Sequence, residues 1–224
     1  MSQLPLDLGF RAALGRADFL IAPCNAAAVA WIDRWPDWPA PALALWGPAG
    51  SGKTHLLEVW RARSKAVAIA PSALTSAAVP ELLGAARAAA IDDAQRADEE
   101  ALLHLYNLLA ERQGHLLLAE REPPARWAIG LADLRSRLAA APAVAVEAPD
   151  DALLGAVLVK LFADRQLRIS EEVIAYLLPR IERSFAAAQA IVAALDRAAL
   201  AGQRAVTVPL ARDILNPDRN RDRG

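Results

Sequence analysis

Short apolar runs alternate with helical patterns through the first two thirds of the chain. Five of these runs predict strands: residues 42–46, 66–70, 88–91, 116–119 and 144–146. Between most of them apolar positions recur with a helical period, most clearly at residues 53–63 and 99–111. This alternation predicts an α/β domain over residues 18–149, with a mainly parallel sheet sandwiched by helices.

Beyond residue 150 the strand patterns almost stop. Helical spacing predicts a small helical domain over residues 150–216, with helices at 153–162, 171–178, 185–201 and 209–215 and a short strand at 206–208. Ser170, followed by two glutamates, is typical of a helix N-cap. The flanking pieces are a leader at 1–17 and a polar tail at 217–224, which we expect to fray.

Charge and composition exclude several classes of protein. The formal net charge is −1, so we expect no strong direct binding to nucleic acid, which usually requires a basic excess. The single Cys24 excludes a disulfide framework. The N-terminus lacks a basic segment typical of a signal peptide, and Gln189, Asp196 and Arg197 interrupt the most apolar stretch. We therefore expect a cytoplasmic protein with no membrane association.

Residues 47–54 match the phosphate-loop pattern G-x-x-x-x-G-K-[ST] in full. An apolar strand precedes the loop and a helical pattern follows it, which is the context that such a loop needs. The backbone N–H groups and the helix N-terminus would surround the phosphates of ADP or ATP. Lys53 would reach the β- and γ-phosphates. The predicted nucleotide-binding set is Gly47, Pro48, Ala49, Gly50, Ser51, Gly52, Lys53, Thr54 and His55.

Two acids follow the third predicted strand. A phosphate loop needs an acid at the end of a neighbouring strand to hold Mg²⁺, and Asp92 is placed for this role together with the hydroxyl of Thr54. Asp93 is placed to orient or deprotonate an attacking water. The alternative is that both are solvated acids at the start of a loop.

Several segments resemble, in order, the AAA+ domain of the bacterial replication initiator DnaA. The matching segments are residues 18–25, 52–56, 91–93, 120–124 and 134–138. The resemblance extends from about residue 18 to residue 215. It implies a P-loop AAA+ domain followed by a helical lid, in agreement with the alternation of strands and helices.

The resemblance implies roles for residues outside the phosphate loop. Residues 18–25 would form the wall of the adenine site, with Leu20 and Ile21 as apolar contacts and Asn25 as a polar one. The alternative is an ordinary buried entry segment. Glu120 stands near the family's first sensor position, where a small polar residue and then Asp are usual, so sensing of the γ-phosphate is in doubt.

Two arginines are implied to act on phosphates. In the predicted lid, Arg183 matches the second sensor, with Arg180 as the fallback; the alternative is a solvated arginine at a helix start. Arg137 matches the arginine finger that is inserted into a neighbouring subunit's nucleotide site, with Arg135 as its competitor. An arginine supplied in this way can accelerate hydrolysis by ~10³–10⁵. The alternative is that both form surface ion pairs.

The leader contains a second resemblance. Residues 3–8 look like the peptide with which replication proteins bind the DNA polymerase sliding clamp; they are Gln3, Leu4, Pro5, Leu6, Asp7 and Leu8. Asp7 departs from the proline that is usual there. The alternative is a leader that docks on its own domain.

A DnaA-like core with a clamp peptide, and no expected helix-turn-helix DNA-binding domain, resembles the Hda family, the regulatory inactivators of DnaA. The implied partners are DnaA and the sliding clamp, with a homo-oligomer also possible. The chain itself would be at most a weak ATPase. The alternatives are a self-contained AAA+ ATPase, such as a helicase loader or DNA remodeller, and a scaffold with a vestigial nucleotide site.

Overall fold

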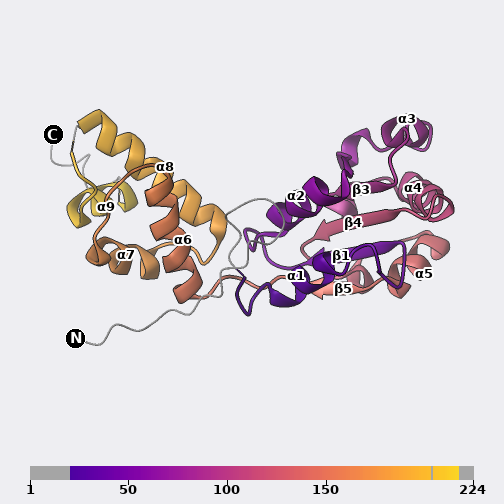
Figure 1. The fold of residues 1–224 in the computed structure, drawn as a ribbon, viewed down its shortest axis with the longest axis horizontal. Coiled ribbons are helices and arrows are strands. Elements are labelled where there is room, and N and C mark those ends of the chain that lie inside the picture. The colour runs from indigo at the N-terminus through magenta and orange to yellow at the C-terminus, as the bar shows by residue number, and fades with distance from the viewer. Residues whose placement is uncertain (1–20, 203, 217–224) are drawn as a thin grey trace. The chain divides into compact units, whose positions relative to one another are not determined.

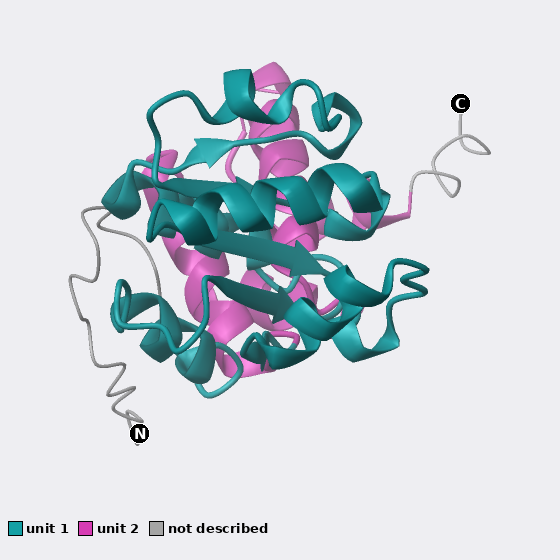
Figure 2. Ribbon diagram, turned by 90° about the vertical axis from the view of Figure 1, so that its right-hand side faces the viewer, with its two compact units in different colours: residues 1–147 teal, residues 148–224 magenta. Residues whose placement is uncertain are grey.

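The computed structural model of the chain describes residues 21–202 and 204–216. The chain divides into two compact units, Met1–Glu147 and Ala148–Gly224 (Figure 2). The predicted boundary, between residues 149 and 150, lies two residues beyond the observed one. The predicted clamp peptide, the leader and the polar tail lie outside the described residues, as does Leu20.

Unit 1 is built on a parallel sheet of five strands in the order β2-β3-β4-β1-β5. The strands are β1 (Ala42–Trp46), β2 (Val67–Ala68), β3 (Ala88–Ile91), β4 (His115–Glu120) and β5 (Ala143–Ala145). All five predicted strands are present, but β2 is shorter than expected. Its pairing with β3 ends early because Pro71 begins a 3-10 turn directly after Ala70.

Helices cover both faces of this sheet (Figure 1). They are α1 (Ala26–Asp33), α2 (Lys53–Ser64), α3 (Val79–Leu83), α4 (Glu99–Glu111) and α5 (Ala132–Ala140), with 3-10 turns η1 (Pro71–Ala73), η2 (Ala94–Arg96) and η3 (Pro124–Arg126). Leu116 and Leu118 of β4 belong to the core that contains residues of α3, α4 and α5, whereas Leu117 belongs to the core that contains residues of α1 and α2. Burial on both faces explains why the strands read as continuous apolar runs. The predicted α/β sandwich is confirmed.

Unit 2 is helical, as predicted. Its elements are α6 (Asp151–Asp164), α7 (Glu171–Leu177), the 3-10 turn η4 (Leu178–Arg180), α8 (Phe185–Gly202) and α9 (Val208–Leu215). Phe162, Leu177 and Leu195 are fully buried in its core. By length and composition α8 could cross a membrane, but its buried side chains form part of this core.

One local prediction in unit 2 is wrong, and one is confirmed. The strand predicted at residues 206–208 is absent from unit 2 as described, because the Thr207 hydroxyl accepts a hydrogen bond from Leu210 N (3.4 Å) and caps α9. The β-branched run is therefore the entry to a helix that has Pro209 in its first turn. Ser170 occupies the N-cap of α7 as predicted, but its side chain makes no capping hydrogen bond.

Candidate functional site

The phosphate loop connects β1 to α2. Gly47 has a φ of +155°. A Cβ on it would lie 2.0 Å from the carbonyl oxygen of Val146, which is too close for any side chain at this position. Gly52 has a φ of +101° and immediately precedes the first residue of α2, Lys53. The glycines of the motif are therefore needed for the backbone path that brings the loop back to a helix N-terminus, where N–H groups can bind an anion.

The Lys53 ammonium is enclosed by this loop. It donates to the carbonyl oxygens of Gly47 (2.7 Å) and Pro48 (2.8 Å), and the residue is only 8% exposed. Burial lowers the pKa of Lys53, and the nearby carboxylates of Asp92 and Glu120 oppose that shift. A buried ammonium that is held by uncharged carbonyls, with acids close by, is suited to receive a phosphate oxygen.

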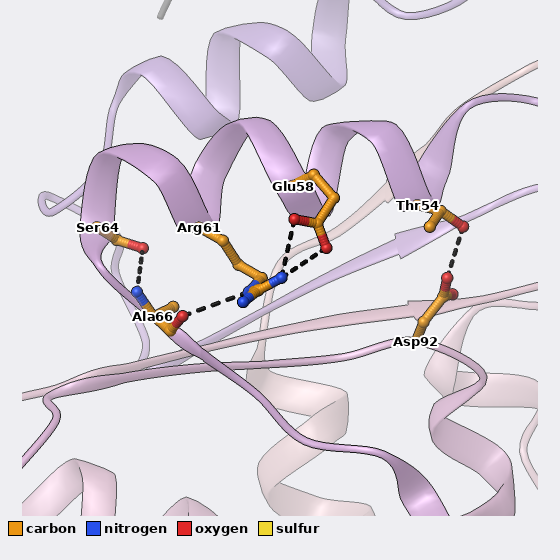
Figure 3. Close-up of polar contacts among 6 residues, drawn as sticks. All are labelled: Thr54, Glu58, Arg61, Ser64, Ala66 and Asp92. Atoms are coloured by element: carbon orange, nitrogen blue, oxygen red, sulfur yellow. Dashed lines mark hydrogen bonds and ion pairs between the residues drawn. The ribbon is translucent and has the colours of Figure 1, made fainter. Parts of the chain in front are cut away.

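Thr54 and Asp92 meet across the loop. The Thr54 hydroxyl donates to Asp92 Oδ2 over 2.5 Å, from the start of α2 to the end of β3 (Figure 3). Hydroxyl and carboxylate oxygens are the ligands that Mg²⁺ prefers, and Mg²⁺ commonly takes only one or two protein ligands together with phosphates and water. These two residues fit such an ion, although the described residues contain no group of three or more His, Cys, Asp or Glu that could hold one alone.

Asp93 is the other acid of the pair. It adopts a left-handed conformation (φ 51°), and its N–H donates to Asp92 Oδ1 (3.0 Å). Its own carboxylate is exposed and lies 3.6 Å from the Arg96 guanidinium. The structure thus places Asp93 beside the Thr54–Asp92 pair, while its role towards a water stays a prediction.

Glu120 is buried at the end of β4, beside the phosphate loop. Its Oε2 accepts from Gln95 N (3.0 Å), its Oε1 accepts from Arg121 N (2.7 Å), and its backbone carbonyl accepts from Gly47 N (3.2 Å). An ionised carboxylate only accepts hydrogen bonds, so it has nothing to donate to a phosphate. Glu120 organises the strand ends around the loop, and its predicted sensor role stays untested.

Of the predicted adenine contacts, the structure describes Ile21 and Asn25. Ile21 is half-buried against the core that contains α1 and α2. Asn25 is buried and its Oδ1 accepts from Ala22 N (2.9 Å), which closes the turn before α1. This bond is the local role expected of a buried entry segment. His55 lies on an exposed position in the first turn of α2.

Arg137 lies on α5, where Asp133 one turn earlier holds it. Its Nε and Nη2 donate to the two carboxylate oxygens of Asp133 (3.1 and 3.2 Å), and its guanidinium lies 5.5 Å from the centre of the Tyr106 ring. The side chains of the pair are 38% and 54% exposed. The competitor Arg135 instead donates to the carbonyl of Ile129 (3.0 Å). Of the two arginines, Arg137 is the one held by an exposed carboxylate.

The two candidate arginines of unit 2, Arg183 and Arg180, also have partners. Arg183 pairs with Asp151 through Nε (2.9 Å) and Nη2 (3.0 Å), and both side chains are mostly exposed. Arg180 donates to the Tyr176 carbonyl (2.9 Å) and stacks on its ring. Unit 2 therefore gives each candidate a local partner, and contact with phosphates stays a prediction.

Sequence reasoning missed two residues that the structure places in contact with α5 or the stretch that leads into it. Glu99 was treated only as the start of a helix, yet its oxygens accept from Gly130 N (3.0 Å) and Leu131 N (2.7 Å), just before α5. Asp133 was not considered as a partner for Arg137, although the i,i+4 spacing was available as a signal. The role of Glu99 had no such signal, because its partners lie more than thirty positions along the chain.

Comparisons with known proteins agree with this architecture. Residues 151–215 match the family model described as the Hda lid domain. An uncharacterised protein of Haemophilus influenzae is 29% identical over 193 residues, covering 80% of this chain and 84% of that protein. Domain III of the Thermotoga maritima replication initiation protein DnaA has the same fold, with a TM-score of 0.73, 18% identity, and coverage of 89% of this chain and 94% of that domain.

A longer initiator structure shares the fold too. The AMPPCP-bound DnaA from Aquifex aeolicus aligns with a TM-score of 0.68 at 18% identity, over 82% of this chain. The chain spans 65% of that initiator's length. Residues 151–215 thus match the lid domain of the Hda family, and the chain has the fold of DnaA domain III over 89% of its length.

Proposed function

We propose that this protein is a nucleotide-bound regulator of replication initiation that stimulates ATP hydrolysis by DnaA. Arg137 would act in trans as the arginine finger, and Gln3–Leu8 would tether the chain to the DNA-loaded sliding clamp in the bacterial cytoplasm. The observation that carries the proposal is the partly exposed Arg137, presented on α5 of a DnaA-like fold whose lid matches the Hda family.

The nucleotide would have a mainly structural role in this chain. Lys53 and the loop N–H groups would bind the phosphates of ADP or ATP, while Thr54 and Asp92 would hold Mg²⁺. Arg183 is proposed to contact the phosphates from the lid. Bound Mg²⁺ would neutralise phosphate charge. The Glu120 carboxylate can only accept hydrogen bonds, whereas a γ-phosphate is stabilised by a donor. Slow ATP hydrolysis by the chain itself is consistent with a mainly structural role of the nucleotide.

The finger would act by charge. The planar guanidinium presents several N–H donors in a fixed geometry that suits a transferring phosphoryl group. To reach one, Arg137 must leave Asp133, and an exposed pair of this kind is worth only about 0.3–0.5 kcal/mol. The cost of releasing the finger is therefore small compared with the charge-assisted bonds that it would form.

The test is hydrolysis of DnaA-bound ATP in the presence of DNA-loaded clamp. Arg137→Ala should abolish the stimulation while nucleotide affinity, measured by calorimetry, stays within about twofold, because Arg137 lies outside the phosphate loop. Arg135→Ala is the matched control on the same helix and should retain most of the stimulation. Full stimulation by Arg137→Ala would refute the finger assignment.

The tether has its own test. A double Gln3→Ala, Leu4→Ala variant should lose the dependence on clamp but keep its fold and nucleotide affinity. Leu4, Leu6 and Leu8 would each contribute about 1.5–3 kcal/mol if fully buried. Persistent clamp dependence in the double variant would show that Gln3–Leu8 is not the tether.

One observation favours a second candidate, a self-contained AAA+ ATPase that acts as a helicase loader or DNA remodeller. The Lys53 and Thr54–Asp92 arrangement is complete enough to support a bound nucleotide and metal ion. Fast turnover by the isolated protein, without DnaA or clamp, would favour this candidate over the regulator.

A further inference from the structure

Glu99 joins two parts of unit 1 that are distant in sequence. It is the first residue of α4, and its carboxylate accepts hydrogen bonds from Gly130 N (3.0 Å) and Leu131 N (2.7 Å). Leu131 is the N-cap residue of α5 and offers no side-chain acceptor to the helix. The backbone that leads into α5 is therefore held by a charged acceptor from another helix.

The segment that carries Glu99 is also fixed at its other end. It starts at Asp92 and Asp93 and continues through η2, where Gln95 N donates to the buried Glu120 carboxylate. Glu120 lies beside the phosphate loop, since its carbonyl accepts from Gly47 N. Two carboxylates thus connect this short segment to its surroundings. Glu120 binds it beside the phosphate loop, and its own Glu99 binds the backbone at the start of α5.

A pocket lies beside the start of α5. A cavity of about 150 Å³ is lined by residues of η2, α4, α5 and the stretch before α5, among them Gln95, Glu99, Trp127, Ile129 and Leu134. Leu134 and Leu138 of α5 are nonetheless buried in the core of unit 1. The two hydrogen bonds from Glu99 therefore act on the start of α5 together with this packing.

We propose that Glu99 is a positioning residue for Arg137, on the premise that the proposed function is right. Arg137 lies six residues after Leu131, or about 9 Å along a helix of 1.5 Å rise per residue. A shift at the start of α5 is therefore transmitted to the finger. Glu99 itself contacts no reacting group; it fixes the helix that presents the arginine, and it does so from the segment that follows Asp92 and Asp93.

The test compares full-length wild-type protein with Glu99→Ala, Glu99→Gln, Glu100→Ala and Arg137→Ala. DnaA–ATP hydrolysis is measured with DNA-loaded clamp over a range of concentrations of each variant. We expect Glu99→Ala to lower the maximal stimulated rate about tenfold or more, because small displacements of a catalytic group can cost up to about a hundredfold. The half-saturating concentration and the ADP affinity should stay within about twofold.

Two variants separate positioning from general effects of charge. Glu99→Gln keeps one carbonyl acceptor and should restore the rate in part. Glu100 is an exposed acid in the same first turn of α4, so Glu100→Ala removes the same charge near the helix terminus without touching Gly130 or Leu131 and should behave as wild type.

Three outcomes would overturn the inference: a wild-type maximal rate in Glu99→Ala, an equal loss in Glu100→Ala, or a loss that merely follows reduced nucleotide affinity or a thermal midpoint below the assay temperature. Full stimulation by Arg137→Ala would instead refute the proposed function. Loss in Arg137→Ala together with none in Glu99→Ala would refute the role of Glu99 alone.

Discussion

Two cationic groups of unit 1, Lys53 and Arg137, are held in opposite ways. The Lys53 ammonium is enclosed by its own loop, bonded to two backbone carbonyls and close to two carboxylates. The Arg137 side chain is partly exposed, and its guanidinium pairs with the Asp133 carboxylate one turn away and lies 5.5 Å from the centre of the Tyr106 ring. A rigid, buried cation is suited to keep a ligand, whereas an exposed cation in a weak pair can exchange its partner. Under the proposed function, Lys53 would keep a resident nucleotide and Arg137 would act on a transient target.

The largest effect that we expect is the loss of nucleotide affinity when Lys53 is replaced. Lys53→Ala should weaken ADP and ATP binding by about 10- to 100-fold, because hydrogen bonds to charged groups are each worth about 1.5–3 kcal/mol. Calorimetry measures this directly. Lys65→Ala, an exposed lysine at the end of the same helix, should bind as wild type. Unchanged affinity in Lys53→Ala would mean that Lys53 only closes the loop.

Much of this nucleotide site could be predicted from the sequence because its parts are local. The phosphate loop occupies eight consecutive residues, and Asp92 directly follows a strand, so sequence order alone brings them to one edge of a parallel sheet. The fold of both units followed from apolar periodicity in the same way. The prediction of a strand at 206–208 was wrong. Thr207 caps α9 and Pro209 lies in its first turn, so the β-branched residues lead into a helix.

The surroundings of the arginine helix could not be predicted. The contacts of Glu99 with Gly130 and Leu131 depend on how α4 and α5 pack against the sheet, and no spacing in the chain encodes them. The same holds for the two backbone N–H groups from which the Glu120 carboxylate accepts, since one of them, Gln95 N, lies 25 residues away in the chain. Long-range acceptors of this kind are found only once the tertiary structure is known.

A smaller effect should come from the metal side of the site. Asp92→Asn keeps an oxygen that can accept from Thr54 but removes the charge that Mg²⁺ favours. We expect nucleotide affinity in excess Mg²⁺ to fall by about tenfold, and the dependence of that affinity on Mg²⁺ concentration to weaken, because a charge-assisted contact is lost. Titrations with and without EDTA measure both quantities. An unaltered Mg²⁺ dependence would exclude Asp92 as a ligand.

The smallest effect is expected when Asp133, the carboxylate that pairs with Arg137, loses its charge. Asp133→Asn removes the charge that holds Arg137, and an exposed i,i+4 pair contributes only about 0.3–0.5 kcal/mol. Maximal stimulation of DnaA should therefore stay within about twofold of wild type, and denaturant unfolding should show a loss of less than about 1 kcal/mol, which includes the lost helix-dipole term. Asp133→Glu, which keeps the charge, is the matched control. A tenfold change in stimulation in Asp133→Asn, but not in Asp133→Glu, would mean that Asp133 positions the finger. Arg137 would then resemble Lys53, because it would be held in place and would not exchange partners freely.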